Sequence, residues 1–561
     1  MLLIFLSWIY IFITTKNFGI LFTKVLGIRD CHPITLQILG LLSYTIVTSF
    51  FAFFFRINVE YYVFILVLNV ILIYSNRNDF KTHSNALILL FKKLKKHYKF
   101  LYLFLFLIVL AQSSTKPYLI DNETYYIQTI KWINEFGYVK GLANLHMFLG
   151  QNSSWHALQA GFNFPFLSNF YNDLNGFLFT IFGLWAIEKL NNYNNRENIQ
   201  SFNLGLVLLF SLFLMQFVNA PSPDLIIFLI TPYIFYLFIS KYKNTTINDF
   251  KIILSLVLFL CFVKVTIIVL SVLVVILFIN NFKVLKGKLL QYLFLSIIIL
   301  GLFIVKNAIV SGYLFYPIAQ IDILSFDWKV PKELLEFYEP NTIEGMSNID
   351  VSQLGLLKKI KVWLTLPKLD GLFNKIFVLL LIIFPWFIYK NKDKSSLLII
   401  YLLAIIQLAI LWFTSPQYRF FFVFVSFLAI QVFSSIIKNK KIGFYLVMLS
   451  IILSAIPVLI TVNLNAFTNN NFAMELNTFK IKNIIVPEEN TKIKTEFAKF
   501  YIDGFEFYSP SEDIFFWATG NGELPCVNKK QIDYIKYYYN YIPQLRTNDL
   551  KNGFKSVLIE K

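Results

Sequence analysis

Long apolar runs alternate with short polar connectors along most of this sequence. A helix needs about 20 apolar residues to cross ~30 Å of hydrocarbon, and these runs are of that order. We count about fourteen runs and predict an all-α polytopic membrane protein. The expected spans lie near Leu2–Leu21, Ile34–Phe54, Tyr61–Tyr74, Leu101–Gln112, Leu174–Leu190, Leu204–Val218, Leu225–Ser240, Ile252–Val263, Thr266–Ile279, Leu289–Val305, Ile376–Tyr389, Leu397–Phe413, Phe421–Ile437 and Phe444–Val462.

The charges of the connectors indicate how these spans are oriented. Basic residues gather in alternate connectors, such as Lys92–Lys96 and Lys438–Lys441. Connectors of this kind stay in the cytoplasm. The alternation is kept only if the run 252–279 forms two helices that reverse direction at Lys264.

The same alternation divides the chain into two predicted domains. Residues 1–463 form the membrane domain, with large external loops at 113–171 and 307–373. Residues 464–561 are more polar and predict a small α/β or α+β extracytoplasmic domain. Its aromatic pieces Ile514–Trp517 and Tyr534–Tyr541 favour strands.

Composition supports the membrane class and excludes others. With 57% hydrophobic residues, 15% charged residues and a mean hydropathy of +0.63, the chain is too apolar for a soluble protein. The net charge of +18 lies mostly in the connectors, so we expect no nucleic-acid partner. The three cysteines show no metal-ligand spacing and no disulfide framework.

The polar loop 113–171 is the strongest candidate for chemistry. Its segment Glu123–Phe136 has the spacing of an amphipathic helix that ends at Gly137. We expect this helix on the outer membrane surface, with Trp132 at headgroup depth. Asp121 then has two interpretations. In the first, Asp121 or Asn122 caps the helix. In the second, the Asp121 carboxylate acts as a general base where membrane meets water.

Further along the loop, His146, Asn152 and Trp155 could bind a sugar through hydrogen bonds and stacking. Alternatively, such residues satisfy the backbone of their own loop. Asp224 begins a span after a proline-rich turn, where it could bind substrate or cap the helix.

Three cations are expected at the outer ends of spans, although most basic residues lie inside. Lys264 interrupts an apolar run, Lys306 ends another, and Arg419 begins a third. Each alone could reach the interface by snorkelling. Together they form a candidate anion site, and a phosphate is the natural ligand.

A series of motifs covers most of the chain. In order, these are Asp121…Tyr125…Trp132…Gly137, GLANLH and NSSW within Gly141–Trp155, SPD at Ser222–Asp224, KNxIxSGYLFYP at Lys306–Pro317, DWKVP at Asp327–Pro331 and SPxxRF at Ser415–Phe420. With the tail segments Leu524–Cys526 and Leu545–Phe554, they resemble a family of uncharacterised multi-spanning bacterial membrane proteins related to the GT-C glycosyltransferase superfamily. The chain departs from that pattern at Tyr126, Phe148 and Gln417–Tyr418.

The resemblance implies a GT-C-like fold and a glycosyltransferase of the bacterial cytoplasmic (inner) membrane. Such enzymes take a sugar from a polyprenyl-phosphate carrier and pass it to a glycan, lipid or protein acceptor on the outer face. Asp121 matches the position of their base, and Glu123 matches less closely. Some relatives use a divalent metal at the acidic loop, but no clear ligand set is visible here, so no cofactor is expected. The alternatives are a polysaccharide polymerase and a non-enzymatic transporter or assembly component for cell-surface polysaccharide.

Overall fold

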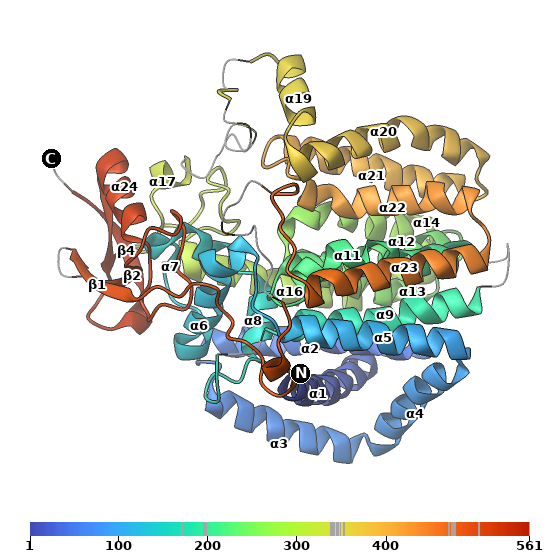
Figure 1. Cartoon of the computed structure of the whole chain (residues 1–561). Coiled ribbons are helices and arrows are strands. Elements are labelled where there is room, and N and C mark those ends of the chain that lie inside the picture. Colours follow the sequence, from blue (N-terminus) through green and yellow to red (C-terminus); the bar gives the residue numbers. More distant parts are fainter. Residues whose placement is uncertain are drawn as a thin grey trace.

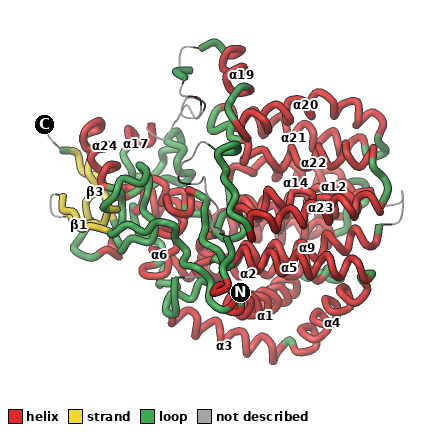
Figure 2. Tube along the Cα trace, viewed as in Figure 1, coloured by secondary structure: helices red, strands yellow, loops and turns green. Residues whose placement is uncertain are grey.

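The computed structural model describes residues 1–559 except 170–171, 194–198, 337–342, 344–346, 348, 352–353, 469–471, 473–477 and 503–504. Tyr171 and Lys561, the predicted ends of the first loop and of the tail, lie outside the described residues. The described chain is mostly helical, and its strands lie in the C-terminal part (Figure 1, Figure 2).

Nine helices of the described chain are long and apolar enough to cross a membrane, so this is a multi-pass membrane protein. They are α1 (Leu2–Leu26), α2 (Pro33–Ala52), the joined helices of Ile199–Phe217, α12 (Pro223–Lys241), Phe282–Ser311 including α16 (Leu289–Ser311), α20 (Lys368–Lys390), α21 (Lys394–Trp412), α22 (Tyr418–Ile436) and α23 (Lys440–Leu459). A tenth arises if α3 (Val59–Ser75) and α4 (Arg77–Lys93), bent by 90°, form one span.

The other expected runs also coincide with helices, but these are shorter or less apolar. They are α5 (Lys96–Ser113), α9 (Leu174–Asn192), α13 (Ile247–Val263) and α14 (Ser271–Asn280). The count of about fourteen spans therefore stays a prediction. The second predicted loop, 307–373, is shorter than expected, because α16 continues to Ser311 and α20 begins at Lys368.

The polypeptide reverses direction at Lys264. This residue is extended (φ −151°, ψ 112°) between α13 and a 3-10 turn, Val265–Leu270, that leads into α14. The rings of Phe250, early in α13, and Phe278, late in α14, lie 5.9 Å apart, so the two helices are antiparallel. The predicted division of the run 252–279 is confirmed, and Lys264 occupies the tip of the hairpin.

The connectors collect at two ends of the bundle. At one end, the Lys95 N–H and the Lys440 ammonium both donate to Asn191, so basic connectors meet there. The C-terminal strands and the short helices α6 (Ile127–Phe136), α7 (Leu142–Leu145) and α8 (Ser154–Ala160) lie at the other end, where most loops gather (Figure 1, Figure 2). This separation agrees with the positive-inside pattern, whereas the orientation in a membrane stays a prediction.

The C-terminal domain is small and of mixed structure. Strand β1 (Phe497–Ile502) pairs antiparallel with β2 (Phe505–Pro510), and β3 (Tyr541–Leu545) pairs antiparallel with β4 (Phe554–Leu558). The predicted strand at 534–541 is wrong over most of its length. Asn528 caps a helix there, α24 (Lys529–Tyr539), which ends at Asn540 in the left-handed conformation (φ 58°). The piece 514–517 forms no strand.

This domain packs on the loop 113–171. Trp132 in α6 is fully buried, and its ring meets the Phe554 ring edge-on at 5.7 Å. On the polar side of α6, Gln128 donates to the Gly522 carbonyl at 2.9 Å. The predicted helix therefore forms, but the placement of Trp132 at headgroup depth is wrong. The polar face is covered by protein, which the periodicity of one helix cannot reveal.

Two of the sequence motifs fasten this domain to the bundle. Arg546 donates to both carboxylate oxygens of Asp327 at 2.8 and 3.1 Å and lies 4.9 Å over the Trp328 ring. The Phe554 N–H donates to the Lys140 carbonyl at 3.0 Å. The DWKVP motif and the tail segment Leu545–Phe554 thus hold the domain in place.

Candidate functional site

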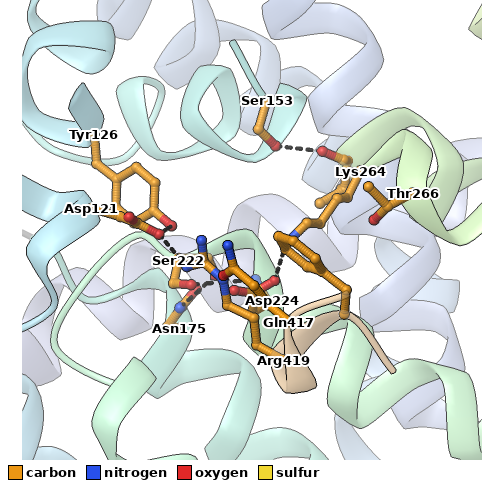
Figure 3. Close-up of polar contacts among 12 residues, drawn as sticks. Asp121, Tyr126, Ser153, Asn175, Ser222, Asp224, Lys264, Thr266, Gln417 and Arg419 are labelled. Atoms are coloured by element: carbon orange, nitrogen blue, oxygen red, sulfur yellow. Dashed lines mark hydrogen bonds and ion pairs between the residues drawn. The ribbon is translucent and has the colours of Figure 1, made fainter. Parts of the chain in front are cut away.

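Two ion pairs lie close together in the structure (Figure 3), and the cations of both contact one aromatic ring. Arg419 Nη1 donates to Asp121 Oδ2, and Lys264 Nζ donates to Asp224 Oδ1. The guanidinium carbon of Arg419 and the ammonium of Lys264 lie 4.9 and 4.4 Å from the centre of the Phe420 ring. We call these four charged residues, which come from four separate segments, the charged cluster.

A π-helix, Asn122–Tyr126, sets the position of Asp121. Its backbone hydrogen bonds join residues five apart. Such helices are rare in proteins, and those that occur are often found at functional sites. The wider turn brings residues i and i+5 onto one face, and the Tyr126 hydroxyl donates to Asp121 Oδ2 at 3.4 Å. The side chain of Asp121 makes no capping bond and is 21% exposed. The capping interpretation is therefore wrong, because the carboxylate binds Arg419 instead.

Asp224 lies in the first turn of α12 and does not cap it. Ser222 is the cap, and its hydroxyl accepts the Asp224 N–H at 3.3 Å. Asn175 fixes this turn by donating to the Ser222 carbonyl at 2.9 Å. The Asp224 carboxylate is only 4% exposed and points at the Lys264 ammonium. Removing one partner from such a buried pair costs about 3–5 kcal/mol, because the other charge stays buried.

The third predicted cation, Lys306, is near the charged cluster but not part of it. Its ammonium donates to the Asn152 carbonyl. The next residue, Ser153, donates to the Val263 carbonyl at 2.7 Å, beside the hairpin tip. The structure thus brings Lys264 and Arg419 together and places Lys306 at a neighbouring point.

Glu123 faces away from Asp121 and binds the start of the C-terminal domain. Its buried carboxylate accepts the Thr491 hydroxyl at 2.6 Å, the Lys492 N–H at 2.7 Å and the Asn122 amide at 3.2 Å. Burial raises the pKa of Glu123, and these donors oppose the shift. The bonds from Thr491 and Lys492 join the loop to the domain, and with the bond from Asn122 they account for this carboxylate without a ligand.

His146 and Trp155 also belong to the packing of the protein. His146 Nδ1 accepts the Phe148 N–H at 3.2 Å, and Nε2 contacts the Gln531 amide at 3.2 Å. Burial lowers the pKa of His146 to about 4. Trp155 is fully buried and donates to Asn175 Oδ1 at 2.7 Å. Its ring is enclosed by protein, so the structure favours the alternative in which Trp155 has a packing role.

Several residues of the site were not singled out from the sequence. Phe420 underlies both cations, Gln417 accepts the Arg419 Nε–H at 2.9 Å, and Tyr126 contacts Asp121. Phe420 lies inside the SPxxRF motif, and the other two stand at departures from the family pattern. These positions carried a signal, but it did not identify a partner.

The two cations and two carboxylates of the cluster balance each other, and the partly exposed Asp121 carboxylate is the group that can accept a proton. Among the described residues, no three His, Cys, Asp or Glu side chains come together as a metal site would require. Asp121 and Asp224 are the carboxylates that a divalent cation would meet here, and each is already bound to a basic side chain.

Comparison with known proteins gives a family and nothing beyond it. No curated protein and no solved structure matches the chain. A family model matches residues 1–426, which include all four residues of the charged cluster and Lys306 but not the C-terminal domain. Over this length the match is decisive, and the chain belongs to the family described as a domain of unknown function, DUF8201.

Proposed function

We propose that this protein is a GT-C-type membrane glycosyltransferase. It transfers a sugar from a polyprenyl-phosphate carrier to a glycan, lipid or protein acceptor on the outer face of the bacterial cytoplasmic membrane. The expectation of about fourteen spans, with the C-terminal domain outside, belongs to this proposal. The observation that carries it is the partly exposed Asp121 carboxylate, bound to Arg419 beside a second carboxylate–cation pair.

The proposed reaction needs a base and a counter-charge. Asp121 takes the proton of an acceptor hydroxyl while the oxygen of that hydroxyl attacks the anomeric carbon of the donor sugar. The bond from that carbon to the carrier phosphate breaks, and its electron pair leaves with the phosphate. Arg419 and Lys264 offset the negative charge that develops there. For this, Arg419 turns from Asp121 towards the phosphate.

The charge arrangement supports a functional site over a purely structural one. Exchanging a buried ion pair for apolar residues is often neutral or stabilising, so stability alone is a weak reason to keep one. Here a buried carboxylate, Asp224, is paired with Lys264, and the partly exposed pair of Asp121 and Arg419 lies beside it.

The test is consumption of a polyprenyl-phosphate sugar by the purified protein in detergent. A lipid-linked product longer than one repeat unit would identify a polymerase, which could use the same groups. Binding of the lipid-linked sugar without consumption would identify a transporter or assembly component.

Asp121→Asn tests the base directly. It keeps the size of the side chain and removes the charge, so turnover should fall ~10²–10⁴-fold. Asp513→Asn is the control, since Asp513 is 69% exposed and pairs with Lys530 in the C-terminal domain. A folded Asp121→Asn protein with the turnover of the wild type would refute the role of Asp121.

A further inference from the structure

Lys306 differs from the other two cations in having no counter-charge. Lys264 and Arg419 each bind a carboxylate, whereas no carboxylate of the described chain lies within 4.0 Å of the Lys306 ammonium. The residue is 2% exposed, and its only hydrogen-bond acceptor in the described chain is the Asn152 carbonyl. The Phe303 ring, 5.3 Å away, offsets a small part of the charge. An ammonium has three donors, so most of its capacity is unused.

Two more polar side chains beside Lys306 are also unsatisfied. Asn152 Oδ1 and both ring nitrogens of His156 are buried and have no hydrogen-bond partner among the described residues. The Pro221 carbonyl opposes the lowering of the His156 pKa but does not meet hydrogen-bond geometry with the ring. A buried polar group without a partner costs about 1–3 kcal/mol, and here such atoms adjoin an unpaired cation.

The unsatisfied groups are contiguous with Asp121. The His156 ring lies 4.7 Å from the Tyr126 ring, whose hydroxyl donates to Asp121. Burial, reinforced by Lys306, lowers the pKa of His156 to about 3, so the imidazole is neutral and has one donor and one acceptor. His156 therefore stands between an unpaired cation and the proposed base.

We propose that Lys306, His156 and Asn152 form a subsite that binds a phosphate carrying a hydroxylated group, as in a sugar phosphate. The cation meets the anionic oxygens, while the neutral imidazole and the amide can both donate to and accept from hydroxyl groups. The charged cluster is balanced by its own carboxylates, whereas Lys306 gains a partner only when an anion arrives. Assigning the ligand to the donor sugar rests on the proposed function, but the anion site itself does not.

Binding can be measured apart from turnover, as the rise in melting temperature of the full-length protein in detergent. The probes are glucose 1-phosphate, inorganic phosphate, farnesyl phosphate and, as the uncharged control, glucose. Lys306→Met removes the cation and keeps the shape. Lys251→Met is the matched control, because Lys251 is also buried and donates to a backbone carbonyl, that of Leu26, at the opposite end of the bundle.

We expect the wild type and Lys251→Met to show a saturable shift with the anionic probes and none with glucose. Lys306→Met should bind at least tenfold more weakly and, without ligand, melt at the same or a higher temperature, because a buried unpaired charge is gone. His156→Phe should weaken glucose 1-phosphate more than inorganic phosphate. If glucose 1-phosphate and farnesyl phosphate both bind, the subsite recognises the phosphate from either source. If farnesyl phosphate binds and glucose 1-phosphate does not, the subsite takes a lipid phosphate and the assignment to a hydroxylated phosphate is refuted.

Two results would overturn the subsite. One is a wild type that responds to no anionic probe, and the other is a folded Lys306→Met protein that binds like the wild type. Binding that depends on Lys306 in a protein without sugar transfer would leave the subsite in place and remove the proposed function.

Discussion

Glu123 is predicted to hold the C-terminal domain on the loop 113–171, and Glu123→Ala tests this. The substitution removes the acceptor that Glu123 offers to the partly buried Lys492 N–H, at about 1–3 kcal/mol. The Thr491 hydroxyl also loses its bond to Glu123, at about 0.5–1.5 kcal/mol. Asn122 lies in the same loop as Glu123 and keeps its own bond to the Asn490 carbonyl at 3.0 Å. Opening of the domain should therefore become easier by about 1.5–4.5 kcal/mol.

Cys526 reports this opening. It is fully buried in the C-terminal domain, and its thiol donates to the Thr519 carbonyl. The N–H of the same Thr519 donates to the Glu123 carbonyl, so Cys526 lies close to this contact. In a protein without Cys31 and Cys261, the labelling rate of Cys526 follows the open population. Since 1.4 kcal/mol is a factor of ten, Glu123→Ala should raise that rate about 10- to 2,000-fold.

Two further variants separate this structural role of Glu123, its contact with the C-terminal domain, from a role in substrate binding. In Glu123→Gln the amide oxygen can accept the Lys492 N–H, and the amide nitrogen can donate to the Thr491 hydroxyl, so labelling should change little. Glu506→Ala is the control, because Glu506 is exposed and pairs with Lys499 at 2.8 Å. A Cys526 labelling rate in Glu123→Ala within threefold of the wild-type rate would refute the structural role of Glu123. Equal labelling rates in Glu123→Ala and Glu123→Gln would refute it as well.

Three other predictions concern stability. Lys264→Met should cost about 3–5 kcal/mol because Asp224 stays buried and charged, and adding Asp224→Asn should restore most of it; additive losses in melting experiments would exclude the pairing. The pKa of His146 falls to about 4 on folding, so the unfolded chain binds more protons between pH 4 and about 6.5. Stability should rise with pH over that window and level off above it, and His146→Asn, which keeps an acceptor for the Phe148 N–H, should flatten the melting-temperature profile. Trp132→Ala should cost about 3–5 kcal/mol as a core truncation, whereas a headgroup-level tryptophan would cost far less in the same assay.

The membrane helices and the hairpin at Lys264 were predictable because they follow from local patterns. Apolar runs mark the helices, and the alternation of basic connectors requires the reversal. The same alternation placed Asp121 and Arg419 at one end of the bundle. It could not pair them, because 298 residues separate the two and no periodicity connects them.

The errors have two physical causes. Trp132 and Glu123 were expected at a surface because their own helix is amphipathic, but the C-terminal domain covers its polar face, and only tertiary contacts reveal this. Tyr534–Tyr541 was expected as a strand because aromatic residues favour sheets, whereas a local signal, the helix cap at Asn528, was overlooked.

The contact between Glu123 and the C-terminal domain also bears on how the protein is made. The partners of Glu123, Thr491 and Lys492, follow it in the sequence by 368 and 369 residues. The partner of Trp132, Phe554, also comes late in the sequence. During synthesis the membrane helices emerge and insert long before these contacts exist. The loop with Asp121 is then finished only when the last strand leaves the ribosome, so a shortened chain can be correctly inserted and still lack an assembled site.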